Sequence, residues 1–114
     1  MKRIDAKRLA LLSQIAEIKA TRAKAVAATR LRHLQALETQ RSEILQKKRS
    51  VQPGLLDPAT AAQTARWMAG FETRMQELSA ETARARAGAE TARETARFEE
   101  GRRQVLSKLG DQAS

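Results

Sequence analysis

The sequence predicts an all-α fold in which two long helices pack as an antiparallel coiled-coil hairpin. Both prolines of the 114-residue chain fall near its middle, at Pro53 and Pro58. On either side runs a long stretch rich in Ala, Glu, Arg, Gln and Leu, which are strong helix formers. Charged residues make up 31% of the chain and aromatic residues only 3%, too few large groups for a compact globular core. We therefore predict a single helical-hairpin domain over residues 1–114.

The helix boundaries follow from residues 52–58, which read QPGLLDP. Proline removes a backbone donor and clashes with the preceding turn, so the first helix is predicted over about residues 3–51. The loop is then predicted over about residues 52–57. Asp57 can cap a new helix and Pro58 suits the first helical position, which predicts a second helix over about residues 58–109.

Apolar residues in the first predicted helix recur at eleven-residue steps, a period that gives a nearly straight seam. Two neighbouring rows make up the predicted contact stripe, and Leu11, Ile18 and Ile44 widen it. One row is Ile4, Ile15, Val26 and Leu37, and the other is Met1, Leu12, Ala23, Leu34 and Leu45.

Apolar residues in the second predicted helix recur at three- and four-residue steps between Ala61 and Leu78, and bulky ones return at Phe98. Alanine is the only apolar residue in between, at positions 79–97. A turn centred on the middle of the loop would place residue i of the first helix opposite residue 109 − i. In this register Leu34 faces Met75, and bulky residues meet bulky residues along the hairpin.

The net charge of +9 is concentrated in the first half of the chain. Residues 1–50 hold 13 Lys or Arg and four Asp or Glu, whereas residues 51–114 hold nine of each. Such asymmetry is typical of a surface that binds an acidic partner, although a solvated helix face has the same composition. A basic hairpin could also bind nucleic acid. The sequence, however, carries no recognised binding motif and few aromatic residues for base stacking.

The sequence does not predict an enzyme, a cofactor or a metal site. It contains no cysteine, no glycine-rich phosphate loop and no cluster with metal-ligand spacing. Nor does it contain a run of about 20 apolar residues that could span a membrane. Trp67 has two readings: it could anchor a partner, or it could pack across the first helix near the loop.

A short, basic hairpin of two long helices resembles the FliJ family of flagellar type III export and its injectisome counterparts of the YscO type. The likeness covers the basic start from Met1 to Arg3, the stripe at 9–12, the break at Pro53 and Gly54, and the Ala/Glu/Arg-rich return helix. The resemblance implies a central stalk whose helical ends enter a hexameric export ATPase, while another part contacts the export gate. By this likeness the inserted end carries Lys2, Arg3, Lys7, Arg8, Arg102, Arg103 and Lys108.

The leading functional expectation is therefore a non-enzymatic stalk or adaptor of a protein export apparatus, in the cytoplasm or at the membrane periphery through its partners. Its expected partners are the export ATPase and the export gate or chaperones, and no small-molecule substrate is expected. The alternative is a general coiled-coil adaptor or chaperone escort, and a nucleic-acid-binding hairpin is a further alternative.

Overall fold

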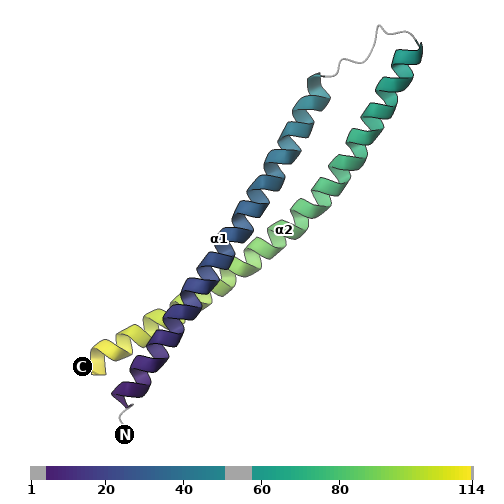
Figure 1. The fold of residues 1–114 in the computed structure, drawn as a ribbon. Coiled ribbons are helices and arrows are strands. Elements are labelled where there is room, and N and C mark those ends of the chain that lie inside the picture. The colour runs from purple at the N-terminus through teal and green to yellow at the C-terminus, as the bar shows by residue number, and fades with distance from the viewer. Residues whose placement is uncertain (1–4, 51–57, 114) are drawn as a thin grey trace. The chain divides into compact units, whose positions relative to one another are not determined.

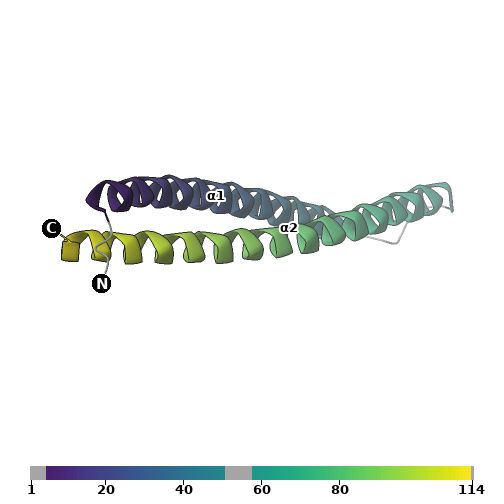
Figure 2. The same ribbon diagram turned by 90° about the horizontal axis from the view of Figure 1, so that it is seen from below.

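Two long α-helices pack against each other in an antiparallel hairpin, as the sequence predicts (Figure 1; Figure 2). The computed structural model describes residues 5–50 and 58–113, with side chains in the second stretch described over 61–112. Helix α1 is Ala6–Ser50 and helix α2 is Pro58–Ala113. The predicted loop over 52–57 lies outside the described residues, as do Met1, Lys2, Arg3 and Ile4.

Local chemistry accounts for the helix boundaries. Asp5 caps α1: its Oδ1 accepts a hydrogen bond of 3.1 Å from the backbone N–H of Lys7, and its carbonyl accepts one of 3.0 Å from Leu9. The last turn of α1 holds three cations, which complement the negative end of the helix dipole. Helix α2 begins at Pro58 as predicted and continues four residues beyond the predicted end at 109.

The chain forms two compact units, and each combines a part of α1 with a part of α2. Unit 1 comprises Met1–Leu31 and Ala87–Ser114, and unit 2 is the continuous segment Arg32–Arg86. The start of α1 and the end of α2 therefore belong to the same unit. The expectation of a single domain stays a prediction.

The interior of the hairpin follows three- and four-residue steps, the spacing of a coiled-coil seam. The seam therefore departs from the predicted eleven-residue rows. In the half of α1 that belongs to unit 1, Leu12, Ile15 and Val26 are 48%, 41% and 51% exposed. An eleven-residue repeat corresponds to 3.67 residues per helical turn, whereas the observed seam corresponds to 3.5. The predicted rows therefore drift away from the seam along the helix. The buried or partly buried seam positions are 9, 13, 16, 20, 23, 27, 34, 37, 44 and 48 in α1, and 64, 68, 71, 75, 78, 82, 85, 89, 92, 96, 99, 103, 106 and 110 in α2.

The pairing register also differs from the prediction. Lys24 forms an ion pair with Glu100, and in unit 2 Glu38 forms one with Arg86. The predicted register would have placed Lys24 opposite Ala85 instead. That prediction assumed that the centre of the loop is the centre of the hairpin and that bulky residues must meet. In unit 2 the buried Leu37 instead lies near Arg86, the partner of its neighbour Glu38, rather than near Phe71.

Candidate interaction surface

The structure brings the described members of the predicted basic end into unit 1 but separates them along it. Lys7 and Arg8 lie in the first turn of α1 and are exposed, as is Lys108 near the end of α2. Arg102 and Arg103 follow Glu100 closely, and Glu100 is paired with Lys24. They therefore lie beside the part of α1 that just precedes Lys24, and the expectation that they lie alongside Lys7 and Arg8 is wrong. The cause is the shifted register.

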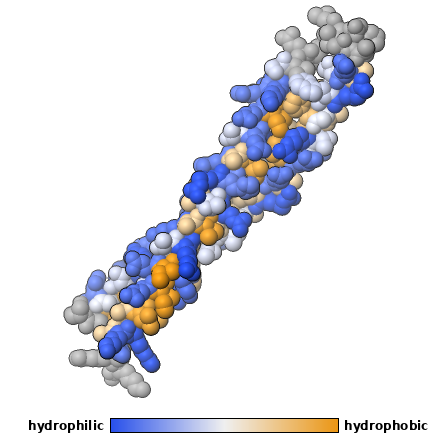
Figure 3. Space-filling view, in the orientation of Figure 1, coloured by the Kyte–Doolittle hydropathy of each residue, from blue (hydrophilic) through white to orange (hydrophobic). Residues whose placement is uncertain are grey.

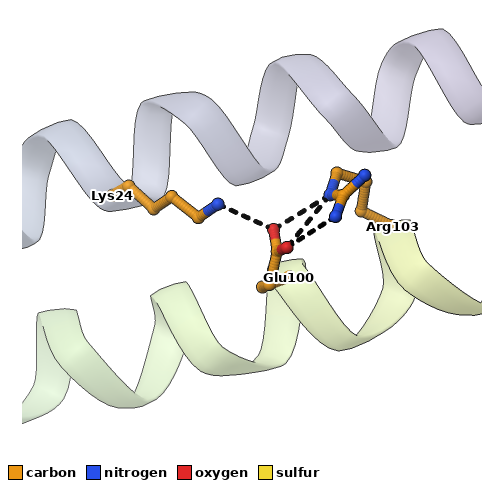
Figure 4. A network of polar contacts seen from close by, with 3 residues as sticks. All are labelled: Lys24, Glu100 and Arg103. Carbon is orange, nitrogen blue, oxygen red and sulfur yellow. Dashed lines mark hydrogen bonds and ion pairs between the residues drawn. The ribbon is translucent and has the colours of Figure 1, made fainter.

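Arg103 is engaged inside the hairpin. Its Nη2 lies 2.7 Å from Oε1 of Glu100, and its Nε donates to both carboxylate oxygens, at 3.1 Å and 3.0 Å (Figure 4). Lys24 reaches the same carboxylate from α1, with its Nζ 2.9 Å from Oε2. The three side chains thus link the two helices, and the only carboxylate among them is already shared by two cations.

This network shifts the ionisation of its members. The hydrogen bond from Arg103, followed by that from Lys24, lowers the pKa of Glu100 from 4.5 to about 2, against a smaller opposing effect of burial. The hydrogen bond to Glu100 in turn raises the pKa of Arg103. Both groups are therefore charged at neutral pH, and Arg103 serves first as a structural residue of unit 1.

The other cations of unit 1 leave their charges on the surface. The guanidinium of Arg102 lies 5.8 Å from the centre of the Phe98 ring, a cation–π contact that leaves both side chains exposed. Five further exposed cations of unit 1 form no ion pair within residues 5–31 and 87–113. They are Lys7, Arg8, Lys19, Arg22 and Lys108.

Trp67 lies in unit 2 and packs against its own helix. Its ring meets that of Phe71 edge to face, with centroids 4.2 Å apart and planes at 78°. Its side chain stays 44% exposed. The described contact is thus with Phe71, one turn along α2, and a role for Trp67 in partner binding stays a prediction.

Sequence reasoning missed the most prominent feature of unit 1, its exposed apolar side chains. Leu11, Ile18 and Phe98 are more than half exposed, at 57%, 52% and 63%. The signal was present: Leu11, Ile15 and Ile18 are spaced by four and three residues, as a second seam would be. The predicted contact stripe instead places these residues in the interior of the hairpin. The surface of unit 1 nearest the chain ends accordingly shows a cluster of apolar residues (Figure 3).

Two surface hollows of unit 1 are open depressions. One is lined by Lys24, Arg93, Arg97 and Glu100 over a floor that includes Gly101. The other is lined by Gln14, Glu17, Ile18, Thr21 and Arg22. No group of three potential metal-ligating acids or histidines occurs among residues 5–50 and 58–113. Neither α1 nor α2, over the described residues, has a stretch apolar enough to cross a membrane.

Comparison of the chain with family models, with curated proteins and with solved structures finds no match. The assignment of a function therefore depends on the chemistry of the surface described above.

Proposed function

We propose that the chain is a non-enzymatic coiled-coil adaptor that binds an acidic partner protein through unit 1. The observation that carries this proposal is the uncompensated positive charge of that unit. Lys7, Arg8, Lys19, Arg22 and Lys108 project from two different helices, and no described acid pairs with them. Several exposed charges on one compact unit add up over an interface, although each alone contributes little.

Among acidic partners, we propose the hexameric ATPase of a flagellar or type III export apparatus, with the chain as its central stalk. The support is the resemblance of this basic hairpin to the FliJ and YscO proteins, together with the placement of both chain ends in unit 1. The export gate or chaperones would be further partners, and the protein would act in the cytoplasm or at the membrane periphery. A general coiled-coil adaptor for another acidic partner is the alternative.

The test is the affinity of the full chain for a purified export ATPase ring at low and at physiological ionic strength. Replacing Arg8, Arg102 and Lys108 together by Ala should weaken binding, most strongly at low salt, because screening already reduces exposed charge attraction at higher salt. The fold should be preserved, since exposed pairs and single surface charges contribute only about 0–1 kcal/mol each.

A matched control removes the same charge from unit 2. Arg41, Arg66 and Arg84 are exposed there, and the triple replacement by Ala should leave binding nearly unchanged. If the wild-type chain does not bind the ring, the export-stalk proposal is wrong. If both triple variants weaken binding equally, the attraction depends on overall net charge rather than on unit 1.

A further inference from the structure

Unit 1 places its small and polar residues inside and many of its large apolar residues outside. The α1 side of its seam consists of Leu9 followed by Ser13, Ala16, Ala20, Ala23 and Ala27. The α2 side includes Glu99, whose Oε2 is buried with no hydrogen-bond partner among the described residues, and Arg103. Buried area is the main source of stability in such a hairpin, and these residues bury little of it. Large contiguous exposed apolar patches mark interaction surfaces in soluble proteins.

Six of the exposed apolar residues of unit 1 lie on one flank. Lys24 and Glu100 each directly follow a seam residue, and their ion pair shows that such residues from both helices meet on one flank. Residues that directly precede a seam residue must then meet on the opposite flank. Leu12 and Val26 precede the seam positions 13 and 27 in α1, and Leu109 precedes position 110 in α2. We call this side the apolar flank.

On the apolar flank each helix carries a stripe with the spacing of a coiled-coil seam. In α1 the stripe runs through positions 12, 15, 19, 22 and 26, and in α2 through 98, 102, 105 and 109. Of these, Leu12, Ile15, Val26, Phe98, Val105 and Leu109 are apolar and between 37% and 63% exposed. Two parallel stripes with three- and four-residue steps are what a third helix requires to pack against a helical pair. A lipid surface would require an apolar face but no such steps on two helices.

The charges on the apolar flank select the kind of helix. The remaining positions of the two stripes are the cations Lys19, Arg22 and Arg102, all exposed, and Arg8 and Lys108 lie next to the stripes. A second copy of the chain packed on this flank would bring the same cations together, and like charges at an interface are unfavourable. A helix with acidic residues beside its apolar stripe would instead pair with them.

We propose that the apolar flank of unit 1 binds a single amphipathic helix of a partner protein whose apolar stripe is bordered by acidic residues. The added helix would complete a three-helix bundle and cover the apolar side chains that the hairpin leaves exposed. The inference does not depend on the identity of the partner, so a failure to bind an export ATPase would leave it standing.

The probe is a synthetic helical peptide of about four heptads, with leucines at the seam positions and glutamates beside them. A second peptide replaces every glutamate by lysine, and a third scrambles the acidic sequence. With fluorescently labelled peptides and the full-length chain, we expect saturable one-to-one binding of the acidic amphipathic peptide alone. Ile15→Ser combined with Val105→Ser should weaken this binding by at least about tenfold, because each removes an apolar side chain from the interface.

The control variant is Leu31→Ser, which removes an apolar side chain that is 49% exposed in unit 1. Position 30 continues the three- and four-residue steps from the seam position 27 to the seam position 34, and Leu31 directly follows it, which places Leu31 on the opposite flank. It should bind the acidic peptide as the wild type does. Circular dichroism should show the same helix content for all variants, since every replaced side chain is exposed.

Three results would overturn the proposal. The first is equal binding of the acidic and lysine peptides, or of the wild type and the Ile15→Ser/Val105→Ser variant. The second is self-association in sedimentation velocity that this variant abolishes, which would assign the flank to a second copy. The third is binding to vesicles that contain phosphatidylserine without binding to the acidic peptide, which would assign it to a lipid surface.

Discussion

At the scale of single residues, Glu100 is the most strongly connected side chain in unit 1. It accepts hydrogen bonds from Arg103 on its own helix and from Lys24 on the other. The Glu100 side chain is 23% exposed, so solvent partly screens the network. The sequence contains all three residues, but nothing in it marks Glu100 above the neighbouring Glu99. The difference arises from the register, which turns Glu100 toward Lys24 and leaves an oxygen of Glu99 buried without a hydrogen-bond partner among the described residues.

The lowered pKa of Glu100 predicts an acid-dependent loss of stability. Because the pKa is about 2 in the folded chain and near 4.5 when unfolded, the unfolded state binds more protons between these values. The contribution of the ionised Glu100 to the free energy of unfolding is therefore complete above about pH 5 and is lost as the pH falls toward 2. Urea unfolding at several pH values should show that Glu100→Gln destabilises the chain near neutral pH but changes its stability little near pH 2. The control is Glu94→Gln, which removes an exposed carboxylate outside this network. Parallel curves for wild type and Glu100→Gln would contradict the assignment.

At the scale of the helices, sequence reasoning succeeded where the signal is local. The start of α2 at Pro58 follows from the fixed backbone of proline, and the extent of α1 follows from an unbroken run of helix formers. It failed on which face of α1 turns inward. The periodicity predicts that the large apolar residues at 11, 12, 15 and 18 form the interior, whereas the small residues at 13, 16 and 20 occupy it. Both sets have helical spacing, so periodicity alone could not decide between them.

Glycines inside α2 offer a test of helix propensity without a change in packing. A Cβ added at Gly70 or at Gly101 meets no heavy atom within 4 Å. Replacing either glycine by alanine should therefore raise the free energy of unfolding by about 1 kcal/mol, because alanine loses less backbone entropy in a helix. Thermal unfolding followed by circular dichroism measures the change. Serine has a helix propensity between those of glycine and alanine, so serine at the same positions should give an intermediate melting midpoint. A lower midpoint for Gly101→Ala than for the wild type would show that a side chain is not tolerated at position 101.

At the scale of the whole chain, an all-α hairpin could be predicted because composition and one central break leave few alternatives. The pairing register could not, because sliding one helix along the other keeps every helix intact and changes only which side chains meet. The candidate surface could be predicted only in part, because it also depends on the register. Its cations in unit 1 were identified from charge counts, but their neighbours depend on the register. Lys19, Arg22 and the apolar flank were therefore missed, and Arg103 was assigned to the surface although it binds Glu100.

The register is directly testable because the chain contains no cysteine, so that engineered pairs are the only thiols present. In the structure Lys24 contacts Glu100 through two long side chains, whereas a disulfide requires Cα atoms within about 7 Å of each other. A Lys24→Cys/Glu100→Cys variant should therefore be joined within one chain by a short bismaleimide cross-linker. The control pair is Lys24→Cys/Ala85→Cys, which the register inferred from the loop would bring together. Ala85 and Glu100 are 15 residues apart in one continuous helix, or about 22 Å along its axis, so a single register cannot bring both pairs together.

The mobility of the chain on a denaturing gel distinguishes the cross-linked from the open form. Preferential closure of the Ala85 pair would restore the loop-centred register. The two stripes of the apolar flank are placed side by side by the Lys24–Glu100 ion pair, which that register would not allow, so this cross-link is the measurement to make first.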